Sequence, residues 1–239
     1  MKVGLFIPCL VDQFFPNTGI ALVKLFKKSK IDFEYPCEQT CCGQPLYNTG
    51  YQKNCLPVAK RFIDIFIKYD YIVAPSGSCL SMVKNNYPNL KFENEYEELS
   101  KSLSKKVFEF SEFFVKILDY TDFGSKFIGK ATYHHSCHLL RELNIKNEPR
   151  ILMKNVKGLE LIESENHNNC CGFGGTFSVK YSDLSDSMGA DKADGIIKTN
   201  ADFVIANDDS CLMQIKDALQ KRESKIRTIH LAEVLAEGL

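Results

Sequence analysis

The sequence predicts an α/β protein made of two similar halves related by internal duplication, each with a small, mainly parallel sheet flanked by helices. Two observations support this class. DYIVAPSGSCLSMV, from residue 70, matches DFVIANDDSCLMQI, from residue 202. Four cysteine positions of the first half also recur, in the same order, about 130 residues later. We therefore expect a first cysteine-rich repeat over residues 1–128 and a second over residues 129–239.

Each half presents the same order of predicted elements. VGLFIP and ATYHHS are predicted as first strands that run into a cysteine, and IDFEYP and LELIES as second strands that lead to an adjacent cysteine pair. Longer helices follow over 51–69 and 184–199, and then the buried parallel strands YIVAP and FVIAN. The segments 107–118 and 228–239 resemble each other, and the extra residues of the first half are predicted as a polar loop over 85–98. Strands alternating with helices in this way are typical of a parallel sheet.

The charge balance excludes several classes of partner. The chain carries 30 basic and 30 acidic residues, so it offers no net charge for nucleic acid or an anionic membrane. The apolar run of MKVGLFIPCLVD is short and interrupted by proline, unlike a signal peptide. No apolar stretch has the length of a membrane span. We expect a cytoplasmic protein.

The ten cysteines need another explanation than disulfides, which are rare in the cytoplasm. The eight that recur in both halves are Cys9, Cys41, Cys42 and Cys79, then Cys137, Cys170, Cys171 and Cys211. Each is predicted to follow the carboxyl end of a strand, the edge where ligand crevices form in open α/β sheets. We expect the four thiols of each half to converge on one crevice, where they suit either zinc or an iron–sulfur cluster. Their spacing does not separate these two.

Other residues are interpreted by their position relative to these cysteines. Candidates for contact with the bound group, without being its main ligands, are His134, His138, Gly172 and Asp208. Glycines after an adjacent pair allow the backbone to approach a cofactor closely and to offer N–H groups to its sulfurs. Cys55 is expected to pack within a helix, and Cys37 is a candidate exchangeable ligand. His135 is a weaker candidate for a site role than His134 and His138, and His167 and His230 are expected to be structural or surface residues.

Cysteine strings in both halves resemble a known family. The pattern of one cysteine, then a CCG triplet after 31 or 32 intervening residues, then a further cysteine resembles the duplicated CCG domains of the cysteine-rich subunit of heterodisulfide reductases. PSGSC, YHHSCHLLRELNI, CCGFGGTFSVKY and HLAEVLA are closer to the LutA/YkgE-type lactate-utilisation iron–sulfur proteins. The resemblance implies an iron–sulfur electron-transfer subunit, with one or two [4Fe–4S] clusters, in a complex that oxidises L-lactate to pyruvate. It implies a ferredoxin-like iron–sulfur subunit and a third subunit as partners, and it identifies no catalytic residue.

One departure from the broader reductase pattern limits what the resemblance implies. Ser76 and Asp208 stand where that pattern has a fifth cysteine in each half. A five-thiolate cluster is therefore in doubt, and four thiolates remain for a [4Fe–4S] cluster, or for zinc in one repeat. Two other functions stay open: a zinc-binding structural or docking module of a redox complex, and a thiol–disulfide oxidoreductase that uses the cysteine pairs directly.

Overall fold

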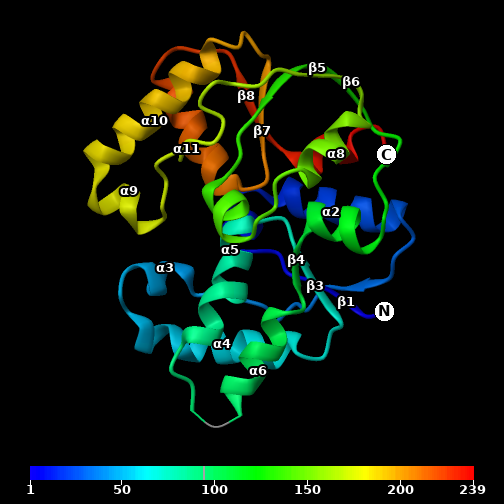
Figure 1. Ribbon diagram of the computed structural model, residues 1–239, viewed down its shortest axis with the longest axis vertical. Coiled ribbons are helices and arrows are strands. Elements are labelled where there is room, and N and C mark those ends of the chain that lie inside the picture. Colours follow the sequence, from blue (N-terminus) through cyan, green and yellow to red (C-terminus); the bar gives the residue numbers. More distant parts are fainter. Residues whose placement is uncertain (94) are drawn as a thin grey trace.

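A computed structural model describes residues 1–93 and 95–239 and contains two parallel four-stranded sheets (Figure 1). The first sheet has the order β2-β1-β3-β4, with β1 (Val3–Leu5), β2 (Phe33–Glu34), β3 (Tyr71–Ala74) and β4 (Val107–Glu109). The second has the order β6-β5-β7-β8, with β5 (Lys126–Tyr133), β6 (Lys157–Leu161), β7 (Phe203–Ala206) and β8 (Arg227–His230). The order is the same in both sheets, and the predicted α/β class with two similar halves is confirmed.

Helices connect the strands of each sheet. In the first half they are α1 (Cys9–Phe14), α2 (Pro16–Lys28), α3 (Gln44–Asn48), α4 (Gln52–Phe66), α5 (Gly77–Ser81), α6 (Tyr96–Ser104) and α7 (Phe110–Glu112), with the π-helical turns η1 (Met82–Asn86) and η3 (Phe113–Ile117) and the 3-10 turn η2 (Tyr87–Asn89). In the second half they are η4 (His138–Glu142, π-helical), α8 (Glu148–Lys154), α9 (Thr176–Lys180), α10 (Ser182–Ile197), α11 (Asp209–Gln220) and α12 (Leu231–Ala236). None of the helices within the described residues is long and apolar enough to cross a membrane.

The two halves pack together through α2 and α7 of the first half and α8 and α12 of the second. Helix α2 of the first half packs against α12 of the second, and α7 packs against α8 (Figure 1). The buried side chains between them form one core that includes Phe26 of α2, Leu152 of α8 and Leu235 of α12. A second core lies under α4 and α6 and includes Leu139, Leu143 and Ile145 of the second half, and a third core lies under α10 and α11. The sheets divide the chain between β4 and β5, so the predicted repeat boundary between residues 128 and 129 lies inside β5. The two-repeat division at that point stays a prediction.

Two local predictions need correction. The fourth strands β4 and β8 are absent from the sequence prediction, because they are short and run directly into the helices α7 and α12. The polar loop predicted over 85–98 is wrong in part: Tyr87 is fully buried, its hydroxyl donates to the carbonyl oxygen of Cys42 at 2.9 Å, and α6 begins at Tyr96. Apolar residues within that polar segment anchor it over α4. Residue 94 of the predicted loop lies outside the described residues.

Candidate metal centres in a shared pocket

The four repeated cysteines of the first half lie where strands give way to helices. Cys9 is the first residue of α1, after β1, and Cys79 lies in the first turn of α5, after β3. The backbone N–H of Cys79 donates to the hydroxyl of Ser76 at 3.4 Å, which caps α5. Cys41 and Cys42 lie on the loop between β2 and α3. The order of elements thus brings the four positions to one edge of the sheet.

The second half repeats this placement. Cys137 precedes the turn η4 after β5, and Cys211 lies in the first turn of α11 after β7. Cys170 and Cys171 lie on the loop between β6 and α9. All ten cysteines of the chain are free thiols.

A glycine in a left-handed conformation follows each cysteine pair. Gly43 has a φ of 85° and Gly172 a φ of 89°, a region that L side chains rarely adopt. The backbone N–H of Gly43 donates to the Cys41 sulfur at 3.3 Å, and that of Gly172 donates to the Cys170 sulfur at 3.4 Å. A Cβ at position 172 would also lie 2.7 Å from the carbonyl oxygen of Ser185. The glycines therefore fold each pair into a turn that holds both sulfurs at the edge of the sheet.

Thiol–thiol hydrogen bonds give both groups the same protonation pattern. Donation from Cys42 and Cys9 lowers the pKa of Cys41 to about 3, and the same contact with Cys41 raises the pKa of Cys9. In the second half, donation from Cys137 and Cys171 lowers the pKa of Cys170 to about 2. Cys41 and Cys170, the first cysteines of the two adjacent pairs, therefore ionise more readily than an ordinary thiol. Four thiolates at such short range require a cation, so a bound metal would displace the remaining protons.

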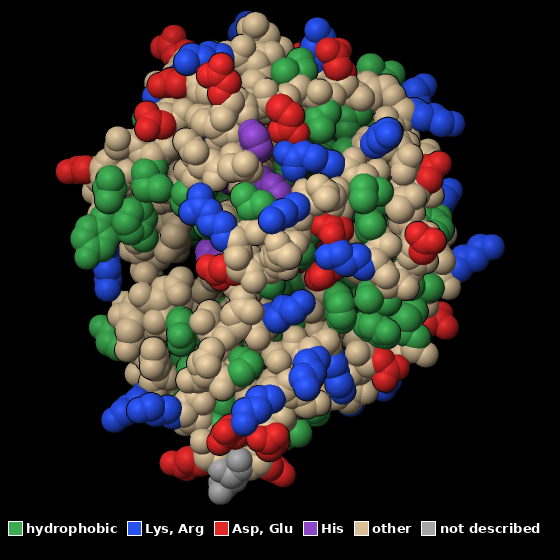
Figure 2. Space-filling model, in the orientation of Figure 1, with side chains coloured by type: hydrophobic (Ala, Val, Ile, Leu, Met, Phe, Trp, Pro, Cys, Tyr) green, Lys and Arg blue, Asp and Glu red, His purple; other side chains and the backbone are tan. Residues whose placement is uncertain are grey.

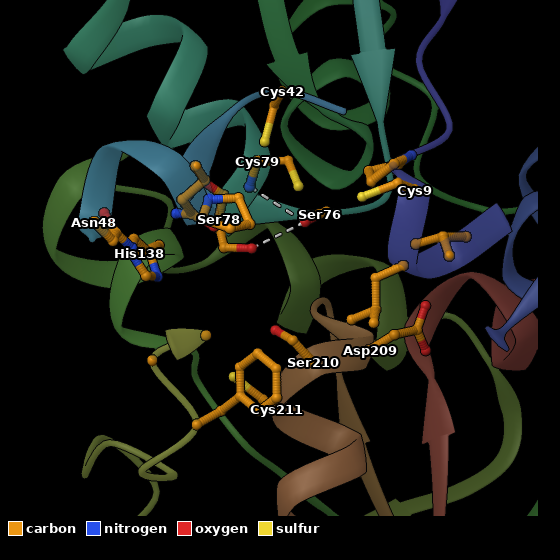
Figure 3. Close-up of a pocket in the computed structure, with 18 of the residues that line it drawn as sticks. Cys9, Cys42, Asn48, Ser76, Ser78, Cys79, His138, Asp209, Ser210 and Cys211 are labelled. Atoms are coloured by element: carbon orange, nitrogen blue, oxygen red, sulfur yellow. Dashed lines mark hydrogen bonds between the residues drawn. The ribbon is translucent and has the colours of Figure 1, made fainter. Parts of the chain in front are cut away.

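The two sets of cysteines open into one pocket of about 530 Å³ (Figure 3). Its lining includes all eight, namely Cys9, Cys41, Cys42, Cys79, Cys137, Cys170, Cys171 and Cys211. The sequence predicted a crevice in each half, and the structure joins the two crevices into a single space between the halves. Figure 3 places Cys42, Cys79 and Cys9 on one side of this space and Cys211 on the opposite side.

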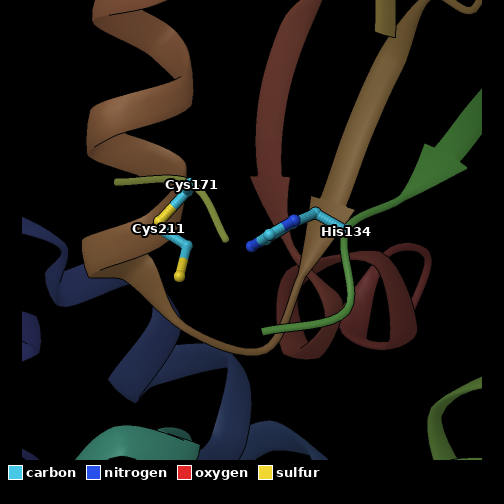
Figure 4. A group of neighbouring side chains, drawn as sticks. All are labelled: His134, Cys171 and Cys211. Carbon is cyan, nitrogen blue, oxygen red and sulfur yellow. The ribbon is translucent and has the colours of Figure 1, made fainter. Parts of the chain in front are cut away.

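The remaining predicted residues fall into different positions. His138 lines the pocket, with its Nδ1 3.6 Å from the sulfur of Cys137. His134 is 2% exposed, and one of its ring nitrogens lies within 4.8 Å of the sulfurs of Cys171 and Cys211 (Figure 4). Burial lowers the pKa of His134 to about 3, so its ring is neutral, the form that binds metals. Asp208 is buried and accepts hydrogen bonds from residues of both halves.

Other cysteines and histidines have different surroundings. Cys55 is buried in α4, with its sulfur 3.6 Å from the carbonyl oxygen of Gly43. Cys37 is exposed before the first pair, and among the described residues it is not part of the pocket lining. The Nε2 of His135 lies 2.8 Å from the carbonyl oxygen of Ile145. His230 caps α12 by accepting from the backbone N–H of Ala232 at 3.1 Å.

Sequence reasoning missed Lys192, a buried cation beside the second set of thiols. It lies in α10, is 1% exposed, and its ammonium donates to the carbonyl oxygen of Asn166. Burial lowers its pKa to about 8, and the charges of Cys171, Cys211 and Cys170 act in the opposite direction. The duplication could have revealed this residue, because the offset of 129 residues between the cysteine pairs aligns Lys192 with Ile63 in the sequence of the first half. A lysine at a position where the corresponding helix buries an isoleucine indicates a buried charge, which is rare unless the charge has a partner.

Comparisons with known proteins support the duplication. The cysteine-rich CCG domain family matches the chain twice, over residues 3–84 and 131–216. These matches define the class as a protein with a duplicated CCG domain. Lactate utilization protein A of Geobacillus sp. (strain WCH70) is 45% identical over 98% of this chain and 99% of its own length. Lactate utilization protein A 2 of Bacillus cereus (strain 03BB102) is 43% identical over 100% of this chain and 99% of its own length. The chain belongs to the family of these lactate utilization A proteins.

A solved structure resembles the whole fold. A hypothetical protein from Helicobacter pylori matches with a TM-score of 0.67 at 13% sequence identity. The match covers 100% of this chain and 49% of that one, so the present chain spans about half of that structure. At this identity the likeness supports the fold alone.

The donor set at the pocket fits a metal ion or cluster. Four soft sulfur donors converge in each half, and sulfur donors are the ligands of zinc and of iron–sulfur clusters. In the second half a buried imidazole lies beside them, and zinc and iron also accept this ligand. The glycine N–H groups supply hydrogen bonds to sulfur, a common way to stabilise bound thiolates.

Proposed function

We propose that this chain is an iron–sulfur redox subunit of a cytoplasmic complex that oxidises L-lactate to pyruvate. The observation that carries the proposal is the set of eight free cysteines, in two groups of four, that line one pocket. Full-length relatives named lactate utilization protein A supply the substrate of the proposal. One [4Fe–4S] cluster in each half would take its thiolate ligands from that half's four cysteines.

The residues of the chain have defined parts in this proposal. A bound cluster supplies one-electron transfer. In each half the cysteines would hold one cluster as thiolates, and the backbone N–H groups of Gly43 and Gly172 donate to sulfur and would stabilise the negative charge. The apolar pocket walls and the burial of Cys42, Cys171 and Cys211 reduce water access to part of each group of sulfurs, which strengthens electrostatic effects on the redox potential there.

The surface around the pocket supports docking of partner subunits. Phe14 of α1 and Val179 of α9 line the pocket and are largely exposed, Val179 at 82%. Tyr181 and Leu184 continue this apolar rim, and Figure 2 shows hydrophobic side chains gathered over the α9 region beside a hollow. We propose that a ferredoxin-like iron–sulfur subunit and a third subunit of the lactate-utilisation system are the partners, with the former at this rim, where short distances to the pocket favour electron transfer.

Metal and sulfide content of anaerobically purified protein tests the proposal. We expect iron and acid-labile sulfide, with a paramagnetic signal after reduction. Cys42→Ser and Cys171→Ser should each remove roughly half of the iron, since each disables one four-cysteine set. The matched control Cys37→Ser, at an exposed thiol outside the pocket lining, should retain all of it.

A second function is favoured by one observation in the second half. The imidazole of His134 beside Cys171 and Cys211 gives a mixed nitrogen and sulfur donor set, which suits zinc. Zinc without sulfide in the purified protein would support a structural or docking module in place of the redox subunit. Loss of free thiols on mild oxidation, reversed by reduction in metal-free protein, would instead support a thiol–disulfide oxidoreductase.

A further inference from the structure

The two cysteine sets differ at the residue that precedes the first cysteine by three positions. In the first half this residue is Phe6, which is fully buried and packs edge-on against Phe62 with the ring centroids 4.8 Å apart. In the second half it is His134. Both leave the end of a first strand, β1 and β5, so the duplicated fold presents a hydrocarbon ring at one site and an imidazole at the other.

The imidazole of His134 is buried without a polar partner. Neither Nδ1 nor Nε2 has a hydrogen-bond partner among residues 1–93 and 95–239, and the side chain is 2% exposed. The backbone N–H of His134 donates to the carbonyl oxygen of Ile205 at 2.8 Å, which fixes the residue beside the end of β7. An unpaired buried polar group destabilises the fold, so this arrangement calls for a partner that the described residues do not provide.

The other buried histidines each have at least one ring nitrogen in a polar contact, although the Nε2 of His230 has no partner among the described residues. His135 contacts the carbonyl oxygen of Ile145, and His230 caps α12. Of the buried histidines in the described part of the chain, only His134 directs its ring at sulfur atoms, with one nitrogen within 4.8 Å of both Cys171 and Cys211 (Figure 4). A metal ion held by these sulfurs would be within reach of the ring.

We propose that His134 is a direct ligand, through a ring nitrogen, of the metal centre in the second half, beside Cys171 and Cys211. The centre in the first half, which has Phe6 at the matching position, is held by thiolates alone. This inference rests on the proposed function, because it assumes that the second set of cysteines holds a metal.

A mixed ligand set has a chemical consequence. If His134 takes the place of one of the four thiolates of the second set, the centre carries less negative charge, which favours its reduced form. The two centres are therefore chemically different despite the duplicated fold. If both centres hold iron, the second centre has the higher affinity for an electron. If the second centre holds zinc, its ligands are sulfur atoms together with the ring nitrogen of His134.

X-ray absorption at the metal edge tests this ligand directly. The Cys42→Ser protein, with the first set disabled, is purified anaerobically so that the spectrum reports the second centre. We expect sulfur neighbours and one nitrogen neighbour at about 2.0–2.1 Å, with the multiple scattering of an imidazole ring. His134→Phe in this background should remove the nitrogen signal and weaken metal retention at least about tenfold. The matched control His135→Gln should keep the spectrum unchanged.

The outcomes separate this inference from the proposed function. If the Cys42→Ser protein retains metal with sulfur neighbours only, and His134→Phe gives the same spectrum, His134 is not a ligand and the metal centre stands. If the Cys42→Ser protein holds no metal although it folds, both the second centre and this inference fail. His134→Cys covers the case in which His134→Phe does not fold: it offers a metal donor again, and we expect metal retained by sulfur ligands alone.

Discussion

The hydroxyl of Ser76 donates a hydrogen bond to the carboxylate of Asp208 at 2.9 Å, joining two positions that correspond in the duplicated halves. Asp208 also accepts from the backbone N–H of Ser78 at 3.1 Å, at the start of α5. Its second oxygen accepts from the hydroxyl of Ser136 at 2.6 Å. Asp208 thus helps to cap the helix of the other half, the one that carries Cys79. Asp208, which stands where the reductase pattern has a cysteine, therefore connects the two halves through hydrogen bonds.

Asp208→Asn tests this link. The amide has one acceptor oxygen for three donors, and its NH₂ group would face at least one of them. We expect a loss of about 1–3 kcal/mol in the free energy of unfolding, measured by urea denaturation of metal-free protein. Asp32→Asn, at an exposed position, should change it by less than about 0.5 kcal/mol. Equal stability of the two variants would show that the carboxylate contributes nothing across the interface.

Gly172→Ala should disturb the second cysteine pair specifically. The alanine Cβ would lie 2.7 Å from the carbonyl oxygen of Ser185 and 2.9 Å from the Cβ of Met188, at a backbone φ of 89°. We expect a stability loss of about 1–3 kcal/mol and loss of metal from the second set, because Cys170 and Cys171 depend on this turn. Gly50→Ala has a similar φ of 91° but open space around the added Cβ, so it provides the control for backbone strain. Metal content is the measurement, and equal retention in both variants would contradict the steric argument.

The features of this protein that could be predicted from its sequence are the ones that occur in both halves. The strands YIVAP and FVIAN and the eight cysteine positions were predictable because the duplication presents each pattern twice. The joining of two crevices into one pocket was not, because it depends on how α2 meets α12 in the shared core, a contact between segments with no common sequence signal. The role of Lys192 was missed because a single lysine in a helix is usually on the surface.

Lys192 should affect the redox potential of the second centre alone. Its buried ammonium lies near Cys170, Cys171 and Cys211, so it stabilises the extra negative charge of a reduced cluster. We expect Lys192→Met to shift the potential of the second centre downward by on the order of 100 mV, because a unit charge in a buried site is worth a few kcal/mol and a one-electron couple moves by about 59 mV for each 1.4 kcal/mol. Redox titration followed by electron paramagnetic resonance, in the Cys42→Ser background, measures this shift. Lys198→Met, at a lysine just after α10, should leave the potential unchanged, and an equal shift in both variants would rule out a local effect.

Glu109 connects the two halves through a buried carboxyl group and should make stability depend on pH. Its side chain accepts from the backbone N–H of Ser111 at 2.8 Å and from the amide of Asn207, in the second half, at 2.9 Å. Asn207 in turn accepts from the hydroxyl of Tyr133 at 2.9 Å. Burial is the largest effect on Glu109 and raises its pKa to about 8, against hydrogen bonds that act in the opposite direction.

The sign of the pH effect follows from this raised pKa. Between the ordinary pKa of glutamate, near 4.5, and about 8, the folded protein binds a proton at Glu109 that the unfolded chain has released. The stabilising contribution is complete below about 4.5 and falls as pH rises toward about 8, with a slope of up to about 1.4 kcal/mol per pH unit. Above that range it stays constant at its lowest value.

Glu109→Gln removes this titration and keeps a side chain of the same shape. We expect the free energy of unfolding of the variant, relative to the original protein, to rise between about pH 5.5 and about pH 8 and to level off above it. Chemical denaturation of metal-free protein at four or five pH values measures this difference, and titrations of the thiols, common to both proteins, cancel. Glu165→Gln, at an exposed glutamate, should show no such trend. A constant difference between Glu109→Gln and the original protein across this range would mean that Glu109 is ionised in the folded state, with the amide of Asn207 and the N–H of Ser111 stabilising its charge despite burial.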